Sequence, residues 1–136
     1  MGIEKISTDE CALSFDAASG ALVVDWKGYA TSAQFRSVSE KILVAVAVKD
    51  VRLLLNDTSE MVLIGATDQE WVVNDFMPRL AAAGIRACAL VSSKHYFNRV
   101  AVATIMREVD ARLMQVEFFE NRAAAAEWLA KIGVAA

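Results

Sequence analysis

The stretch that decides the fold is VRLLLNDTSEMVLIGATDQEW, which runs from Val51 to Trp71. Its first part, Val51 to Asn56, is an almost unbroken apolar run, which is typical of a strand covered on both faces of a sheet. The polar residues 57–59 predict a corner after that strand. Thr67, followed three residues later by Glu70, predicts a capping box at the start of a helix. The stretch therefore predicts one strand-to-helix unit of a parallel sheet.

Upstream of this stretch the sequence predicts a hairpin. The β-rich segments 12–15 and 21–26 flank the turn AASG, in which Gly20 can adopt the positive φ that a tight connection needs. A short edge strand is also expected within residues 3–7.

The next element is expected to be a helix. Thr31 and Gln34 predict a capping box at its start. Its expected buried stripe consists of Phe35, Val38, Ile42 and Ala45. Residues 43–48 are apolar all round, which indicates deep burial or an interface. The alternating valines in 44–48 also fit a strand, but Lys49-Asp50 followed by another apolar run favours a helix.

Downstream, the helix that starts near Thr67 is expected to bury Val72, Phe76, Leu80 and Ala83. Pro78 should kink it or start a new turn, and Gly84 should end it. A strand is expected at 87–91, followed by a helix that Ser92 and Ser93 cap and that runs to about Arg112. Its expected buried face is Tyr96, Val100, Ala103 and Met106.

The last two elements are a strand at 114–119 and a helix capped by Asn121, whose inward face is expected to be Ala125, Trp128, Leu129 and Ile132. The chain therefore predicts a single α/β domain over residues 1–136, with no linker or internal repeat. We expect a mixed sheet of about five strands, in which parallel βαβ units follow an antiparallel hairpin, and about four helices.

Composition restricts the class of protein. The 136 residues are 56% hydrophobic and 23% charged, with a net charge of -3. Because acidic and basic residues are interspersed, nucleic acid is not expected as a partner. The longest apolar run, 42–48, is too short to span a membrane, and the N-terminus lacks an apolar signal region, so a cytoplasmic location is expected. Cys11 and Cys88 are expected to be buried small hydrophobes.

Residues with catalytic potential do not form a constellation. His95 is the single histidine, and no nucleophile elbow or activated thiol lies near it in the sequence. The acidic residues lack the spacing of a zinc, calcium or magnesium site. We therefore expect no catalytic, cofactor-binding or metal-binding residues, and a protein that is not an enzyme.

Polar and aromatic residues follow two of the expected strands. In open parallel sheets, ligands bind beyond the carboxyl ends of the strands. The candidate ligand or partner surface therefore comprises Asn56, Asp57, Thr58, Ser59, Thr67, Trp71, Ser93, His95 and Tyr96. The same residue types are needed for caps and turns, and that structural alternative remains open.

Four segments resemble the small bacterial STAS-like proteins: DWKGYATSAQF, LLLNDTSEM, DQEWVVNDFMPRLAAAGIR and FFENRAAAAEWL. This family is related to the anti-sigma-factor antagonists and is grouped by fold with CRAL-TRIO lipid-binding domains. The resemblance implies a mixed sheet backed by helices. In the antagonists, an Asp-Ser-Ser-Gly-like turn carries a phosphorylated serine. The equivalent turn here is Gly65-Ala66-Thr67-Asp68, so only Thr67 could accept phosphate, and Asp68 and Glu70 would repel it.

These observations lead to two hypotheses of function. The first is a non-enzymatic regulatory module that binds a partner protein or forms a homodimer through the apolar second half of the Thr31 helix and the face from Trp71 to Phe76. The alternative is a carrier of a small apolar ligand or lipid, which the CRAL-TRIO relationship implies. The carrier would need an internal cavity, expected to be lined by Val62, Ile64, Phe76 and Met106.

Overall fold

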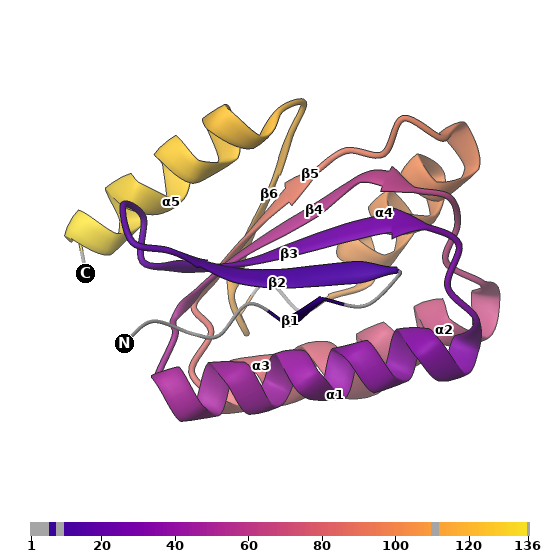
Figure 1. Ribbon diagram of the computed structural model, residues 1–136, viewed down its shortest axis with the longest axis horizontal. Coiled ribbons are helices and arrows are strands. Elements are labelled where there is room, and N and C mark those ends of the chain that lie inside the picture. The colour runs from indigo at the N-terminus through magenta and orange to yellow at the C-terminus, as the bar shows by residue number, and fades with distance from the viewer. Residues whose placement is uncertain (1–5, 8–9, 110–111, 136) are drawn as a thin grey trace.

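The computed structural model describes residues 6–7, 10–109 and 112–135. Within these residues, six strands form one sheet in the order in which they occur in the sequence (Figure 1). The strands are β1 (Ile6–Ser7), β2 (Cys11–Asp16), β3 (Ala21–Gly28), β4 (Leu53–Met61), β5 (Ala87–Val91) and β6 (Gln115–Phe119). The helical segments are α1 (Ser32–Lys49), α2 (Ala66–Trp71), η1 (Val72–Phe76), α3 (Met77–Ala82), α4 (Tyr96–Glu108) and α5 (Arg122–Ala135).

The sheet is mixed, as the sequence predicts. Strands β1, β2 and β3 pair antiparallel in succession, and β3 to β6 pair parallel. The five expected strands are present, and the two-residue β1 adds the short edge strand that was expected within residues 3–7. Because α2, η1 and α3 follow one another without a break, the helices form the four units that the sequence predicts. The α/β fold class is therefore confirmed.

The sheet separates two apolar layers of unequal size. Helices α1, α2, α3 and α4 cover one face, and α5 lies on the other (Figure 1). The larger core lies under the four helices, whereas α5 contributes Ala125 and Leu129 to a smaller one. Alanines at positions 87 and 89 of β5 allow α5 to lie close to the strands. In the described part of the chain, no helix is long and apolar enough to cross a bilayer.

The N-terminal elements follow their local signals. Gly20 has a φ of +78° and closes the hairpin turn, in which its backbone N–H donates to the carbonyl oxygen of Asp16. Thr31 and Gln34 form the expected capping box at the start of α1. All four residues of the expected buried stripe are buried. Cys11 and Cys88 are also buried, as predicted.

The predicted polar corner at 57–59 is wrong, because β4 continues through these residues to Met61. The carboxylate of Asp57 still accepts a hydrogen bond from the backbone N–H of Ser59 at 2.9 Å, as an Asx-type turn would. This local turn appears in β4 as a bulge-like shift of register. Asp25 pairs with Asp57, whereas Lys27, two residues later, pairs with Glu60, three residues later. Polar residues therefore distort the strand without ending it.

The predicted capping box at Thr67 is also wrong. Helix α2 begins at Ala66, its N-cap is Gly65, and Thr67 is an exposed residue of the first turn. The side chain of Asp68 is buried and accepts hydrogen bonds from Ser32 and Arg36 of α1, at 2.7 and 3.0 Å. Asp68, which lies between the two residues of the predicted box, therefore bonds to α1, whereas Thr67 and Glu70 remain exposed.

Pro78 changes the helix as predicted. The segment Val72–Phe76 is a wider π-helical turn, and the backbone N–H of Met77 donates to the carbonyl of Val72. Since proline has no N–H and its ring crowds the preceding turn, the wider turn relieves the clash and α3 begins beside it. Gly84, with a φ of +115°, follows the end of α3 as expected.

Helix α4 differs most from its prediction. It starts at Tyr96 and ends at Glu108, and neither Ser92 nor Ser93 caps it, since its N-cap is His95. Its buried residues are Asn98, Ala101, Val102 and Ile105. Tyr96 and Val100, which were expected to be buried, are exposed. The cause is Asn98, a polar side chain whose hydrogen bonds place it on the inner face.

The C-terminal elements agree with the sequence. Strand β6 starts one residue later than predicted, after the buried Met114. The side chain of Asn121 accepts a hydrogen bond from the backbone N–H of Ala124 at 2.8 Å and so caps α5. Ala125 and Leu129 are fully buried, and Trp128 and Ile132 pack at the edge of the same core.

Candidate binding surface

Four of the nine residues predicted to form a ligand or partner surface instead hold the interior together. Asn56 accepts a hydrogen bond from the indole N–H of Trp26 at 3.0 Å, and the Thr58 hydroxyl donates to the carbonyl of Val91 at 2.6 Å. The Ser93 hydroxyl donates to the carbonyl of Met61 at 2.8 Å. Asp57, the fourth, binds Arg122 of α5 at 2.8 Å.

These side chains also point to different faces of the sheet. Asn56 and Thr58 line the helix-covered interior, whereas Asp57 faces α5 because successive strand residues alternate in direction. Burial acts to raise the pKa of Asp57, but hydrogen bonds from Ser59 and Arg122 outweigh it, and the pKa lies below its ordinary value. The strand ends therefore do not bring these residues together.

Trp71 is half-buried in an aromatic stack. Its ring lies 5.5 Å from that of Phe76 and 6.2 Å from that of Phe35, measured between centroids. The guanidinium of Arg36 lies 5.1 Å above the indole and also pairs with Asp68. Trp71 is therefore only partly accessible to solvent.

The other predicted residues lie at the surface. Thr67, His95 and Tyr96 are exposed, and Ser59 is half-buried. Ser59 lies near the carboxyl end of β4. Thr67 follows β4 in the chain, and His95 and Tyr96 follow β5. His95 and Tyr96 are consecutive residues at the start of α4, so these two remain together on the surface.

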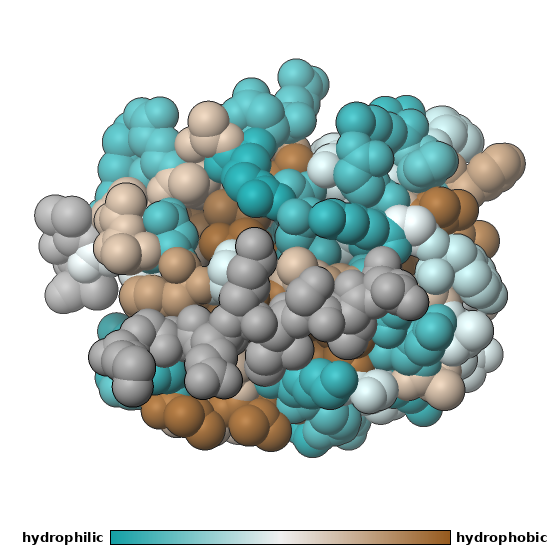
Figure 2. Space-filling model, viewed as in Figure 1, coloured by the Kyte–Doolittle hydropathy of each residue, from teal (hydrophilic) through white to brown (hydrophobic). Residues whose placement is uncertain are grey.

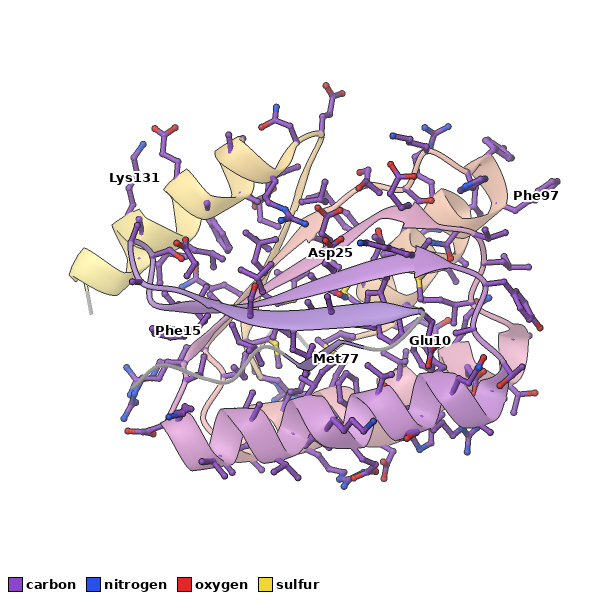
Figure 3. All side chains as sticks on the ribbon, viewed as in Figure 1. Glu10, Phe15, Asp25, Met77, Phe97 and Lys131 are labelled. Atoms are coloured by element: carbon purple, nitrogen blue, oxygen red, sulfur yellow. The ribbon has the colours of Figure 1, made fainter. Side chains whose placement is uncertain are left out.

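Exposed apolar side chains gather at this end of the sheet. We call them the strand-end patch, which consists of Tyr29, Val62, Leu63, Tyr96, Phe97 and Val100. They follow β3, β4 and β5, which are neighbours in the sheet. Figure 2 shows brown and tan side chains at the right-hand end of the molecule, where Figure 3 places Phe97 at the tip. Phe97 is 76% exposed, which is unusual for phenylalanine in a folded domain.

Buried hydrogen bonds hold the three segments of the patch together. The amide of Asn98 accepts from the backbone N–H of Ile64 at 2.9 Å and donates to the carbonyl of Met61 at 3.3 Å. The backbone N–H of Val62 donates to the carbonyl of Gly28 at 2.9 Å, which joins the segment after β4 to the one that carries Tyr29. The patch is therefore a preformed surface on a fixed frame.

Charged groups flank the patch beside the start of α4. Lys94 pairs with Glu60, and this ion pair raises the pKa of the Lys94 ammonium. The guanidinium of Arg99 lies 5.7 Å from the ring of Tyr96, and the two rings of Tyr96 and Phe97 meet edge to face at 5.5 Å. An apolar centre with a charged rim is the usual anatomy of a protein interface.

Local sequence patterns do not reveal most of this surface. Of the patch, only Tyr96 is among the predicted surface residues, and the sequence predicts Val62 in a cavity. Two consecutive aromatic residues, Tyr96 and Phe97, gave a usable signal, because side chains about 100° apart on a helix cannot both occupy a narrow buried stripe. Asn98 gave no local signal, since its partners lie more than thirty residues away.

An interior cavity of about 40 Å³ lies between the sheet and its helices. Ile64, Phe76 and Met106 line it, as the carrier hypothesis expects, whereas Val62 is on the surface and does not. The polar side chains that reach this cavity have partners, and no buried side-chain nitrogen or oxygen among the described residues lacks one.

Two buried groups could have served as nucleophiles. Burial raises the pKa of the Cys88 thiol to about 12, and burial together with the nearby Asp25 raises that of Cys11 to about 12. Thiols with such values carry almost no thiolate near neutral pH. Residues 6–7, 10–109 and 112–135 contain no group of three or more acidic, histidine or cysteine side chains placed to hold a metal ion.

No family model matches the chain, and no curated protein matches it. The structure is similar to the crystal structure of an uncharacterized protein from Shewanella loihica PV-4, a protein of the DUF3478 family with a SpoIIAA-like fold. The two chains are 14% identical with a TM-score of 0.60, over 91% of this chain and 98% of that chain. The likeness shows the fold alone, so this chain has the SpoIIAA-like, STAS-like architecture that the sequence resemblance implied.

Proposed function

From this SpoIIAA-like fold and its strand-end patch, we propose that the protein is a non-enzymatic regulatory module that docks a partner protein through the patch. One observation carries the proposal: exposed apolar side chains from three segments converge on one end of the sheet. Aromatic side chains such as Tyr96 and Phe97 are enriched in the cores of protein interfaces. The Asn98 frame fixes the surface before binding, which lowers the entropic cost of association.

Binding without catalysis fits the chemistry of the described residues. The two buried thiols are poor nucleophiles, and the shifted pKa of Asp57 accompanies the ion pair that anchors α5. His95 stands at the start of α4 without a side-chain capping bond, beside apolar groups that suit recognition. Thr67 is exposed near the same end of the sheet, where a bound partner could contact it.

Site-specific photo-crosslinking tests the proposal. We would replace Phe97 by p-benzoylphenylalanine, and as a control we would replace Lys131, whose side chain on α5 is 75% exposed and lies far from the patch (Figure 3). We expect a discrete protein adduct from position 97 in cells that make the protein, and its loss when L63E is added. Equal adducts from both positions, or no effect of L63E, would contradict the proposal.

Homodimerisation is a second candidate, and a different surface favours it. Val44 and Val48, in the second half of α1, are 62% and 72% exposed. They belong to the apolar segment 43–48, whose composition indicates deep burial or an interface. Sedimentation velocity of the wild type and of V44E/V48E tests it: a concentration-dependent dimer that the variant abolishes supports it, and a monomer at every concentration excludes it.

A carrier of a small apolar ligand or lipid has less support. Sites for drug-sized molecules have volumes of roughly 300–1,000 Å³, whereas a cavity needs about 10–15 Å³ of probe volume for one water. The interior cavity of about 40 Å³ suits water more closely than an acyl chain. A thermal shift with fatty acids or phospholipids, measured on delipidated protein, would restore this function.

A further inference from the structure

A second surface lies at the opposite end of the parallel strands. An open cleft of about 470 Å³ forms where the hairpin turn, the starts of β4 and β5, and the end of α5 meet. Its walls include Phe15, Leu53 and Ile132. Its charged residues are Lys49, Asp50, Arg52 and Arg86, so cations outnumber anions three to one. Figure 3 shows Phe15 at the end of the molecule opposite Phe97, so this cleft is separate from the strand-end patch.

The two arginines occupy matched positions. Each immediately precedes a strand, and the backbone N–H of Arg86 donates to the carbonyl of Arg52 at 2.7 Å. Adjacent strands of a sheet are about 4.8 Å apart, so the two side chains start from neighbouring points on the same edge. Two guanidinium groups so placed can bind the oxygens of one phosphate or carboxylate.

Their positive charge is largely uncompensated. Among the residues that the structure describes, Arg86 forms no ion pair. Arg52 approaches Asp50 only at 4.0 Å, and the side chains of this pair are 50% and 81% exposed. An exposed pair of this geometry contributes little energy, so Arg52 can turn to an incoming anion at small cost.

Most of the other residues that line the cleft are apolar. Phe15 is 41% exposed although it belongs to β2, and Leu53 and Ile132 continue its surface. A Cβ added at Gly133 of α5 would stand 3.4 Å from the Leu53 side chain and 3.6 Å from the carbonyl of Ser19. The end of α5 therefore packs against the start of β4 and the hairpin turn, and the cleft is present without a ligand.

We infer that this cleft binds a small amphiphilic anion, whose phosphate or carboxylate lies between Arg52 and Arg86 and whose apolar part lies against Phe15. The volume of the cleft is within the range of about 300–1,000 Å³ that is usual for small-molecule sites. Apolar walls contribute affinity by burial, and the arginine pair selects charge. The site is independent of the proposed partner surface.

Calorimetric titration with monomeric octyl phosphate tests the inference. We expect saturable binding to the wild type, at least tenfold weaker binding to R52Q/R86Q, and weaker binding to F15S. Octyl glucoside and inorganic phosphate should each bind at least tenfold more weakly than octyl phosphate, because each lacks one of the two features. R107Q, an exposed arginine on α4, is the matched control and should bind as the wild type does.

Vesicles distinguish the source of the anion. If vesicles containing phosphatidylglycerol bind the protein and R52Q/R86Q abolishes this, the anion is a lipid headgroup. If octyl phosphate binds and the vesicles do not, the anion is a soluble metabolite. Either of these two results supports the site. The inference is overturned if octyl phosphate does not saturate, or if R86Q alone, which removes no ion pair of the described structure and should fold normally, binds as tightly as the wild type.

Discussion

The guanidinium of Arg122 lies 2.8 Å from the carboxylate of Asp57 and 3.1 Å from that of Asp25. Arg122 belongs to the first turn of α5, and the two acids belong to the neighbouring strands β4 and β3. One side chain thus ties the helix on the lesser-covered face to the centre of the sheet. Since Asp57 is buried, Arg122 together with Ser59 stabilises its charged form there.

Replacing Arg122 by glutamine should therefore destabilise the protein in a pH-dependent way. Because the Arg122 side chain is 47% exposed, we expect a loss of only about 1–2 kcal/mol at pH 7. The folded-state pKa of Asp57 lies below its ordinary value, so the stabilisation is complete above that value, near pH 4, and is lost as the pH falls through the folded-state pKa. Urea unfolding at pH 7 and pH 3 should show the difference between wild type and R122Q narrowing at pH 3. A difference of equal size at both values would exclude the ion pair as its cause.

Replacing Asn98 by leucine should lower the free energy of unfolding, although leucine is apolar and of similar size. The substitution leaves the buried backbone N–H of Ile64 without its acceptor. It also removes one of the hydrogen bonds that the carbonyl of Met61 accepts. We expect about 2–3 kcal/mol in urea unfolding. T104A, on the same helix, removes only hydrogen bonds near the surface and should change the free energy of unfolding by less than about 0.5 kcal/mol. Similar values for the two variants would contradict the role given to Asn98.

A charge should destabilise the protein at one valine of α1 and leave its stability almost unchanged at another. Val46 is fully buried, so V46E places a carboxylate in the core and should reduce stability by more than about 3 kcal/mol. Val44 is exposed, and V44E should change stability by less than about 0.5 kcal/mol. Thermal melts followed by circular dichroism would measure both. Only V44E can therefore test assembly without unfolding the chain, and a cooperative, wild-type melt of V46E would show the burial to be misassigned.

The cysteine thiols should resist modification in the folded protein. With pKa values of about 12 and with both side chains buried, Cys11 and Cys88 present almost no thiolate at pH 8. Ellman's reagent should react with neither in native buffer over minutes and with both in denaturant. Rapid reaction of one thiol in native buffer would reveal an opening of the core.

The signals that succeeded act over a few residues. The Thr31 and Gln34 box, the positive φ at Gly20 and the Asn121 cap each depend on backbone groups within four positions, so the sequence contains all the partners. The alternation of strands and helices then restricts the topology, and the fold class follows.

The failures have long-range causes. Asn98 is buried because its partners come from the segment after β4, and a pattern that counts amides as polar assigns the wrong face to α4. Asp57 was placed at a sheet edge because three polar residues imitate a corner, although the strand continues past them. The strand-end patch was missed for a similar reason: apolar side chains are expected to be buried, and only the assembled chain shows which ones are not.

The order of the strands affects how the sheet can assemble during synthesis. Every strand pairs with the strand that precedes it in the chain, so each new strand can extend an existing edge without inserting between two others. Pairing each strand with its predecessor avoids the additional loop-closure entropy of more distant pairings, which favours stepwise growth from the amino-terminal side. The face under α5 acquires its cover only when the last helix docks. We therefore expect nascent chains that end after β6 to bind hydrophobic dyes and chaperones more strongly than chains that include α5, which ribosome-bound truncations would reveal.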